Sequence, residues 1–205
     1  MQFYTHFLMS IYGVLFASII AIPIGIFIAK KHSLAPWIIG FANILQTIPS
    51  LAMLSIMLLV LGLGPITVIA TVFVYSLLPI IKNTYTAITN VNKFLIDIAK
   101  GMGMSKWQIL LKIKLPLSVS IIMAGIRNAL VVAIGISAIG TFIGAGGLGD
   151  IISRGINVAN GGYIVWAGAI PTAFMAIISD LALSFMEKRL DPTNNKSIKR
   201  IPYRN

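Results

Sequence analysis

The sequence contains no cysteine, two histidines and five acidic residues. The absence of cysteine excludes disulfide bonds and thiol chemistry. An enzyme site needs clustered His, Asp or Glu side chains to hold a metal or to activate a nucleophile, whereas His6 and His32 flank a long apolar run. Ser137 lacks the second glycine of a G-x-S-x-G nucleophile motif. We therefore expect neither a catalytic residue nor a metal site.

Charged residues are also scarce, since they make up 10% of the chain and hydrophobic residues 58%. A mean hydropathy of +0.94 excludes a soluble domain with a polar surface. A membrane-spanning helix needs about 20 mostly apolar residues. The sequence offers such runs near 8–29, 37–61, 65–81, 117–143 and 163–186. We expect an all-α membrane protein with about five spanning helices in a single transmembrane domain, residues 1–205.

Lys and Arg are distributed unevenly between the loops of this topology. Cytoplasmic loops carry an excess of basic residues, and an N-terminus outside the cell puts all of them except Arg127 and Arg154 on the inner side. The tail, 191–205, is then cytoplasmic. The net charge of +11 therefore indicates topology and contact with anionic membrane lipid. The sequence has no basic stripe with interleaved aromatic residues, so nucleic acid is not expected as a partner.

The longest polar loop, residues 83–116, follows the third apolar run. Asn90 or Asn92 can cap a helix there by accepting a backbone N–H bond, and this helix is expected to begin near Lys93. Its apolar residues fall on one arc: Phe94, Leu95, Ile98, Ala99 and Met102. The charged residues fall on the other arc, so the helix is predicted to lie on a surface.

This surface helix is expected to end at Gly101 and Gly103. Ser105 and Gln108 form an S-x-x-Q capping box, which predicts a second helix that Pro116 helps to end. The loop is therefore predicted to form a helix, a sharp turn and a helix. Periodicity alone leaves two interpretations open, a docking element for a partner protein and an amphipathic connector that rests on lipid headgroups.

The run 97–103, Asp-Ile-Ala-Lys-Gly-Met-Gly, is followed by nine residues and then by Ile-Lys-Leu-Pro. This spacing resembles the EAA signature of importer permeases in the ATP-binding-cassette superfamily: E-A-A, three residues, Gly, nine residues, I-x-L-P. The sequence departs from the signature at Asp97, where Glu is usual, and at Ile98, where Ala is usual. The resemblance implies a coupling helix that sits in a groove of a cytoplasmic ATPase. By position, the coupling residues are Asp97, Ala99, Gly101, Gly103, Leu115 and Pro116.

Four further segments narrow the resemblance: 46–52, 62–64, 75–80 and 144–149. They are similar to permeases for glycine betaine, carnitine and choline, which are osmoprotectant importers of prokaryotic cytoplasmic membranes. The resemblance implies a type I importer fold and assembly with a second permease subunit, identical or paralogous, two ATPase subunits and an external solute-binding protein. ATP and Mg²⁺ are used by the ATPases, and no cofactor is expected on this chain. A methionine or other small-solute importer of the same architecture stays open as an alternative.

Polar residues within apolar runs indicate a translocation path, because they are costly in lipid and tend to face a cavity or the bundle interior. The second run carries four of them at i, i+3, i+4 and i+7, on one face of a continuous helix: Asn43, Gln46, Thr47 and Ser50. Interhelical hydrogen bonding is the alternative role. In the third run, Tyr75 can attract a quaternary ammonium group through cation–π contact. A passive channel would need only such a path and would leave the polar loop without a purpose.

Two charges fall within apolar runs, Arg127 and Asp180. Unpaired charges are expensive in lipid, so a stabilising pair or an interfacial anchor is favoured over a contact with solute. Asp150 and Arg154, four residues apart, are expected to form a local ion pair. The glycine-rich segment 144–149 lacks the Lys-Ser or Lys-Thr of a nucleotide-binding loop, and we expect a turn or a hinge there.

Overall fold

A computed structural model describes residues 1–190, which form helices and connecting turns without a strand. The predicted all-α fold is confirmed. The predicted cytoplasmic tail, 191–205, lies outside the described residues. In chain order the elements are α1 (Gln2–Lys30), the 3₁₀ turn η1 (His32–Leu34), α2 (Ala35–Thr47), α3 (Ser50–Leu61), α4 (Pro65–Thr89), α5 (Lys93–Gly101), α6 (Lys106–Ile109), the π-helical turn η2 (Leu110–Lys114), α7 (Leu115–Ile139), the 3₁₀ turn η3 (Gly140–Ile143), α8 (Leu148–Ile156) and α9 (Gly162–Leu190).

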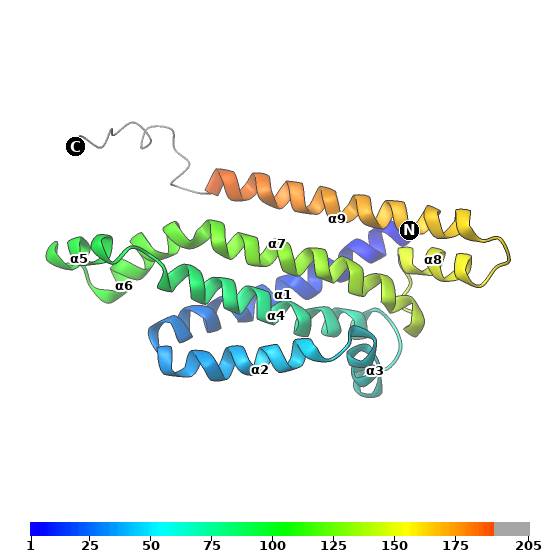
Figure 1. The fold of residues 1–205 in the computed structure, drawn as a ribbon, viewed down its shortest axis with the longest axis horizontal. Helices are drawn as coiled ribbons and strands as arrows, with labels where there is room; N and C mark the ends of the chain where they lie inside the picture. Colours follow the sequence, from blue (N-terminus) through cyan, green and yellow to red (C-terminus); the bar gives the residue numbers. More distant parts are fainter. Residues whose placement is uncertain (191–205) are drawn as a thin grey trace.

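The long helices α1, α4, α7 and α9 lie alongside one another and make up most of the bundle (Figure 1). α4 packs against both α1 and α7, and α9 packs on α7 and α8. α2 and α3 contact α4, on the side of the bundle away from α9 (Figure 1). The core lies where α1, α4 and α7 meet, and it includes the fully buried residues Ala17, Val72 and Ile134.

α1 and α4 approach each other closely because α1 carries glycines where it faces α4. A Cβ atom at Gly13 would overlap the side chain of Val72, and one at Gly25 would overlap the side chain of Thr84. Small residues of this kind let helix backbones approach in membrane proteins, where van der Waals packing drives association. The glycines of α1 therefore set the distance of the central helix pair.

Within residues 1–190, four helical segments are long and apolar enough to cross a membrane, and α2 with α3 adds a fifth crossing if the bent pair counts as one span. The prediction of one helix over 37–61 is wrong, because α2 and α3 meet at an angle of 95°. Pro49 disfavours a helical conformation for the residue before it. Ile48 accordingly adopts an extended ψ of 128°, and α2 ends there.

The predicted loop 83–116 is shorter in the structure, because α4 extends into it as far as Thr89. The end of α4 stays helical although its hydropathy falls, because Thr84 and Ile88 are buried. Thr84 lies against Gly25 of α1. Packing against α1 thus extends α4 beyond the apolar run.

The second helix of the loop does not end at Pro116, contrary to expectation. α6, η2, α7 and η3 form one helical segment, Lys106–Ile143. Proline removes a backbone N–H and presses on the preceding turn. The π-helical turn Leu110–Lys114 ends two residues before Pro116, and it accommodates the missing hydrogen bond without a break in the helix.

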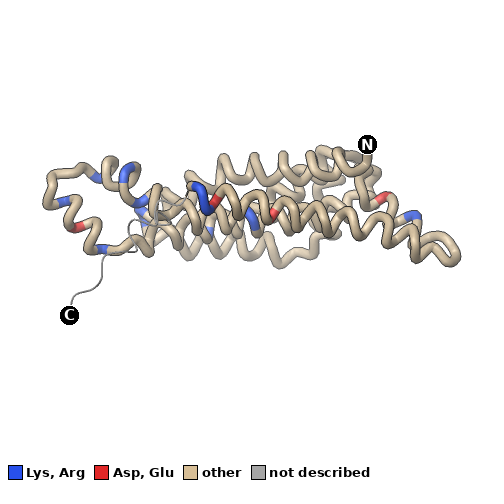
Figure 2. The backbone as a smooth tube through the Cα atoms, turned by 90° about the horizontal axis from the view of Figure 1, so that it is seen from above, with Lys and Arg blue, Asp and Glu red and all other residues tan. Residues whose placement is uncertain are grey.

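Basic residues gather at one end of the molecule (Figure 2). This basic end holds α5, α6 and the start of α7, whereas the N-terminus and α8 lie at the opposite end (Figure 1). α9 runs back from α8 toward the basic end and carries Lys188 and Arg189 in its last turn. The start of α1 and the end of α9 therefore point toward opposite ends of the bundle, as an odd number of crossings requires.

Candidate functional site

α5 is a short surface helix at the basic end (Figure 1). The Asn92 side chain, one of the two predicted caps, accepts a hydrogen bond from the Phe94 N–H at 2.9 Å. The side chains of Phe94, Ile98 and Met102 are 68%, 45% and 74% exposed. Contiguous exposed apolar side chains mark a contact with a partner or a membrane. The predicted amphipathic helix is confirmed, and its apolar arc is exposed in the single chain except at Ala99, which is buried.

A sharp turn ends α5, as predicted. Gly103 adopts a φ of +78°, in the left-handed region that favours glycine. Its N–H donates to the Lys100 carbonyl at 2.9 Å, and the Met104 N–H donates to the Ala99 carbonyl at 3.0 Å. These two bonds form the Schellman motif, which satisfies the last carbonyl groups of a helix. Gly103 therefore sets the angle between α5 and α6.

The predicted capping box at the start of α6 is present. The Ser105 Oγ accepts from the Gln108 N–H at 3.3 Å, and the Ser105 N–H donates to the Gln108 Oε1 at 2.8 Å. These bonds satisfy two N–H groups at the helix start that would otherwise lack partners. Because α6 continues into α7, a displacement of α5 and its turn acts on a helix that reaches the far end of the bundle.

The two parts of the EAA-like segment lie beside each other. Ala99 is 1% exposed, and with Pro116 it lines a cavity of about 420 Å³ between α5 and the start of α7. Leu115 packs against the buried pair Ile88 and Leu110. The burial of Ala99 and the packing of Leu115 thus hold the helix-turn-helix against the bundle.

Asp97 lies on the exposed side of α5, where its carboxylate contacts the Lys100 ammonium at 2.9 Å. The two side chains are 68% and 62% exposed. A surface ion pair of this kind contributes little to stability, so Asp97 can exchange it for a contact with a partner at small cost. A Cβ atom at Gly101 would meet open space. The coupling role of these residues stays a prediction.

The four polar residues of the predicted stripe do not share one helical face. Asn43, Gln46 and Thr47 lie on α2, whereas Ser50 begins α3 beyond the bend. Asn43 and Thr47 are exposed in the single chain, and Gln46 and Ser50 are half-buried. The prediction of a continuous stripe is wrong at Ser50, because Pro49 redirects the chain. A role of the α2 residues in a pathway stays a prediction.

Tyr75 is buried, with 7% of its surface exposed. Its hydroxyl donates a hydrogen bond to the Ile48 carbonyl, which the break between α2 and α3 leaves without a helical partner. In this structure Tyr75 stabilises the bend. Its contact with a solute stays a prediction.

Arg127 and Asp180 form a stabilising ion pair, one of the two roles that the sequence favoured over a contact with solute. The Arg127 Nε donates to the Asp180 Oδ1 at 2.8 Å and its Nη2 donates to the Oδ2 at 3.1 Å. Sequence reasoning missed the third member, Glu187, which accepts from the Arg127 Nη1 at 2.9 Å. Glu187 follows Asp180 by seven residues on α9, and this helical spacing was the available signal.

A polar network at the opposite end was also missed. The His6 Nδ1 accepts from the Leu148 N–H at 3.2 Å, so its Nε2 carries the proton and donates to the Ile134 carbonyl at 2.9 Å. Ser10, one turn further along α1, bonds with the Ser137 hydroxyl at 2.9 Å. These residues tie α1 to α7 and to the start of α8. The spacing of His6 and Ser10 by four residues was the signal in the sequence.

The glycine-rich segment 144–149 forms the predicted turn. Gly144, Gly146 and Gly147 have φ values of +69°, +76° and +91°. The Gly147 N–H donates to the Gln2 Oε1 at 2.6 Å. Its role as a hinge stays a prediction.

The expected ion pair between Asp150 and Arg154 is wrong for the described residues, 1–190. No salt bridge joins these two side chains within that range. Asp150 instead accepts a hydrogen bond from the Thr141 hydroxyl. The Thr141 hydroxyl on η3 is a competing donor close to the start of α8, and it binds the carboxylate in place of Arg154.

This architecture defines a class of protein, a polytopic α-helical membrane protein with an exposed amphipathic helix at its basic end. The chain belongs to the family described as the binding-protein-dependent transport system inner membrane component, whose model matches residues 21–192.

Several relatives match nearly the whole chain, among them two transport permeases of Listeria and Bacillus. The carnitine transport permease protein OpuCD of Listeria monocytogenes serotype 1/2a (strain 10403S) is 61% identical over 195 residues, which cover 95% of this chain and 87% of the relative. The glycine betaine/carnitine/choline transport system permease protein OpuCD of Bacillus subtilis (strain 168) is 57% identical over 195 residues, with 95% and 85% covered.

Among solved structures, a chain of the MetNI methionine ABC transporter in an inward-facing conformation matches with a TM-score of 0.81. The match covers 91% of this chain and 93% of that chain at 20% sequence identity. At this identity the likeness concerns the fold, and it confirms the predicted architecture of a type I importer permease.

Proposed function

We propose that this chain is the permease subunit of an ATP-driven importer that carries quaternary-amine osmoprotectants across the cytoplasmic membrane. The observation that carries this proposal is the match of 61% and 57% identity, over 95% of the chain, to permeases named for carnitine, glycine betaine and choline. The chain itself supplies no ATPase, so the energy comes from partner subunits that bind ATP and Mg²⁺.

The basic end faces the cytoplasm in this proposal, because cytoplasmic loops hold the excess of Lys and Arg. The N-terminus then lies outside. α5 sits in a groove of the ATPase and offers the exposed side chains of Phe94, Ile98 and Met102 to it. The Gly103 turn and α6 pass the motion of the ATPases into α7, which continues α6 in one helical segment.

The translocation path lies between this chain and a second permease subunit, identical or paralogous. Asn43 and Thr47 support this placement, because polar side chains exposed on a membrane helix are costly in lipid and favour a wet interface. An external binding protein delivers the solute. ATP binding closes the ATPases and turns the cavity outward, so that it receives the solute. Hydrolysis of ATP then returns the cavity to the inward-facing state.

Uptake by cells tests the substrate class. Transport-deficient cells receive the complete transporter with or without this subunit, and uptake of labelled glycine betaine, carnitine, choline and methionine is measured after an osmotic upshift. Uptake of a quaternary amine that requires the subunit supports the proposal. Uptake of methionine alone would keep the fold and overturn the substrate class.

A further inference from the structure

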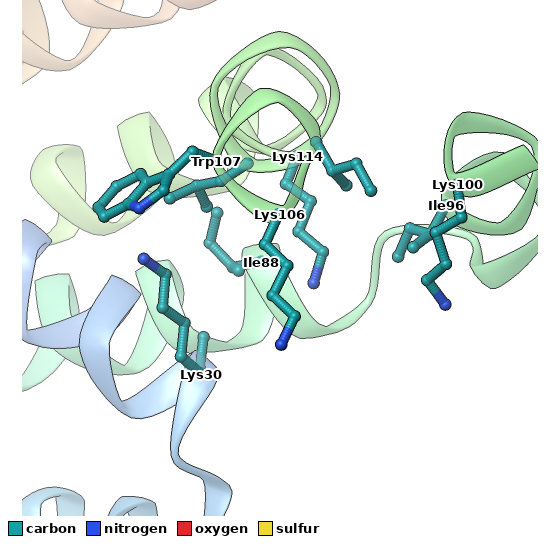
Figure 3. Close-up of a pocket in the computed structure, with 10 residues that line it drawn as sticks. Lys30, Ile88, Ile96, Lys100, Lys106, Trp107 and Lys114 are labelled. Atoms are coloured by element: carbon teal, nitrogen blue, oxygen red, sulfur yellow. The ribbon is translucent and has the colours of Figure 1, made fainter. Parts of the chain in front are cut away.

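A cationic cavity of about 480 Å³ opens at the basic end, between the ends of α1 and α4 and the helices α5 and α6 (Figure 3). Its volume lies within the range of small-molecule sites. Apolar side chains form part of its lining, among them Ala29, Ile88 and Leu110. Four lysines also line it: Lys30, Lys100, Lys106 and Lys114.

The lysines of this cavity come from separate elements (Figure 3). Lys30 rises from the end of α1, and its ammonium group lies 3.7 Å from the centre of the Trp107 ring. Lys106 and Lys114 extend from α6 and from η2 (Figure 3). Lys100 approaches from α5 and already contacts Asp97.

Three of these charges have no carboxylate to balance them within residues 1–190. The salt bridges of this range involve Lys100 and Arg127, and none involves Lys30, Lys106 or Lys114. Like charges gathered around one cavity repel each other, and the repulsion grows where apolar walls lower the local dielectric. An anion in the cavity relieves this repulsion, so the electrostatics favour a negatively charged ligand.

The position of the cavity selects the kind of anion. Lys30 is the last residue of the α1 span, and Lys114 directly precedes α7, so the lysines lie at the level where membrane helices end. Trp107 is 64% exposed beside them, and tryptophan is enriched at the membrane interface. Basic pockets between membrane helices bind lipid headgroups. A cationic rim over apolar walls fits a phosphate joined to an apolar body.

We propose that this cavity binds the phosphate headgroup of an anionic phospholipid. Lys30, Lys106 and Lys114 surround the phosphate, and the apolar walls contact the glycerol and the first acyl carbons. Trp107 holds the Lys30 ammonium by a cation–π contact. The lipid thereby joins the end of α1 to the helix that continues from the α5 turn. The site requires a membrane setting and does not depend on which solute is carried.

Quenching of tryptophan fluorescence by brominated lipid tests the site locally. The chain has three tryptophans, so the Trp37→Phe and Trp166→Phe substitutions leave Trp107 as the sole reporter. The full-length chain is reconstituted in vesicles of phosphatidylcholine with increasing brominated phosphatidylglycerol, or with brominated phosphatidylcholine in its place. We expect quenching to saturate at a low fraction of brominated phosphatidylglycerol, and to rise without saturation for brominated phosphatidylcholine.

Two double variants separate the cavity from general surface charge. Lys106→Gln with Lys114→Gln should weaken the apparent affinity for phosphatidylglycerol about thirtyfold, since each lysine near an anionic surface contributes roughly a factor of five. Lys82→Gln with Lys93→Gln removes the same charge from exposed residues that do not line the cavity. This control should leave the affinity unchanged.

Four results would overturn the proposal. Equal quenching by both brominated lipids, or equal loss in both double variants, would show general contact with the membrane. Displacement of the lipid by millimolar inorganic phosphate would assign the cavity to a free anion. Loss of lipid-dependent quenching on addition of the partner ATPase would assign it to the protein interface.

Discussion

Arg127 on α7 and Asp180 on α9 meet in a two-point ion pair, with Nε–Oδ1 and Nη2–Oδ2 distances of 2.8 and 3.1 Å. The planar guanidinium matches the carboxylate, and such paired bonds add geometric specificity to their energy. Glu187 occupies the remaining side of the guanidinium. α9 packs on α7 and α8 with much of its surface exposed, so this cluster fixes its position along α7.

The Arg127→Met substitution tests the cluster, because methionine keeps an unbranched stem like the inner part of arginine and removes the charged guanidinium. Asp180 and Glu187 are then left without their cation. The three side chains are 27%, 36% and 22% exposed, so we expect a loss of about 1 to 3 kcal/mol, below that of a fully buried pair. Thermal unfolding in detergent measures it. Arg154→Met, at an exposed residue, is the control, and an equal shift in both variants would contradict the role of the cluster.

Gly103→Glu tests the coupling helix. The φ of +78° at Gly103 disfavours any side chain, and a carboxylate there also changes the surface of the turn. We expect co-purification with the ATPase to be abolished and insertion into the membrane to be retained. Gly162→Glu is the control, because a Cβ at Gly162, at the start of α9, meets open space. Unaltered co-purification of the Gly103→Glu variant would rule out this docking site.

His6→Ala tests the network at the opposite end. The substitution leaves the Leu148 N–H and the Ile134 carbonyl without their side-chain partner and opens a void around a residue that is 0% exposed. We expect a loss on the order of 3 kcal/mol in unfolding free energy. His32→Ala, at an exposed residue, should change stability by less than about 0.5 kcal/mol. Similar unfolding temperatures for the two variants would argue against a structural role of His6.

Tyr75→Phe separates two roles of one residue. The substitution keeps the ring and removes the hydroxyl that bonds to the Ile48 carbonyl. We expect a loss of about 1 kcal/mol in stability and an unchanged KM of uptake. Tyr75→Leu removes the ring as well. If its KM for choline rises while that of Tyr75→Phe does not, the ring binds the solute and the structural role is not the main one.

The helical class and most of the long helices can be predicted from the sequence, because hydropathy over about 20 residues reflects the membrane directly. The turn at Gly103 and the capping box at Ser105 were also predictable, since their bonds are local. The bend at Pro49 was harder to predict. A proline is tolerated inside a membrane helix when other groups satisfy the freed backbone, as Pro23, Pro79 and Pro171 show.

Tertiary contacts decided the features that the sequence did not reveal. The Ile48 carbonyl can leave the helix because the hydroxyl of Tyr75, on α4, donates a hydrogen bond to it and so stabilises the bend. Glu187 joins Arg127 only once α7 and α9 are packed. The cationic cavity likewise needs Lys30 and Trp107 to meet across two helices. Patterns along one segment do not contain these relations.

Transport into proteoliposomes tests the central claim most directly. The complete transporter is reconstituted with the binding protein outside, and uptake of labelled glycine betaine, carnitine and choline is followed with ATP on the ATPase side or without it. We expect accumulation of a quaternary amine above its external concentration that requires ATP and is lost with Gly103→Glu in this subunit. Equilibration without ATP, or accumulation that Gly103→Glu leaves intact, would contradict an ATP-driven permease coupled through α5.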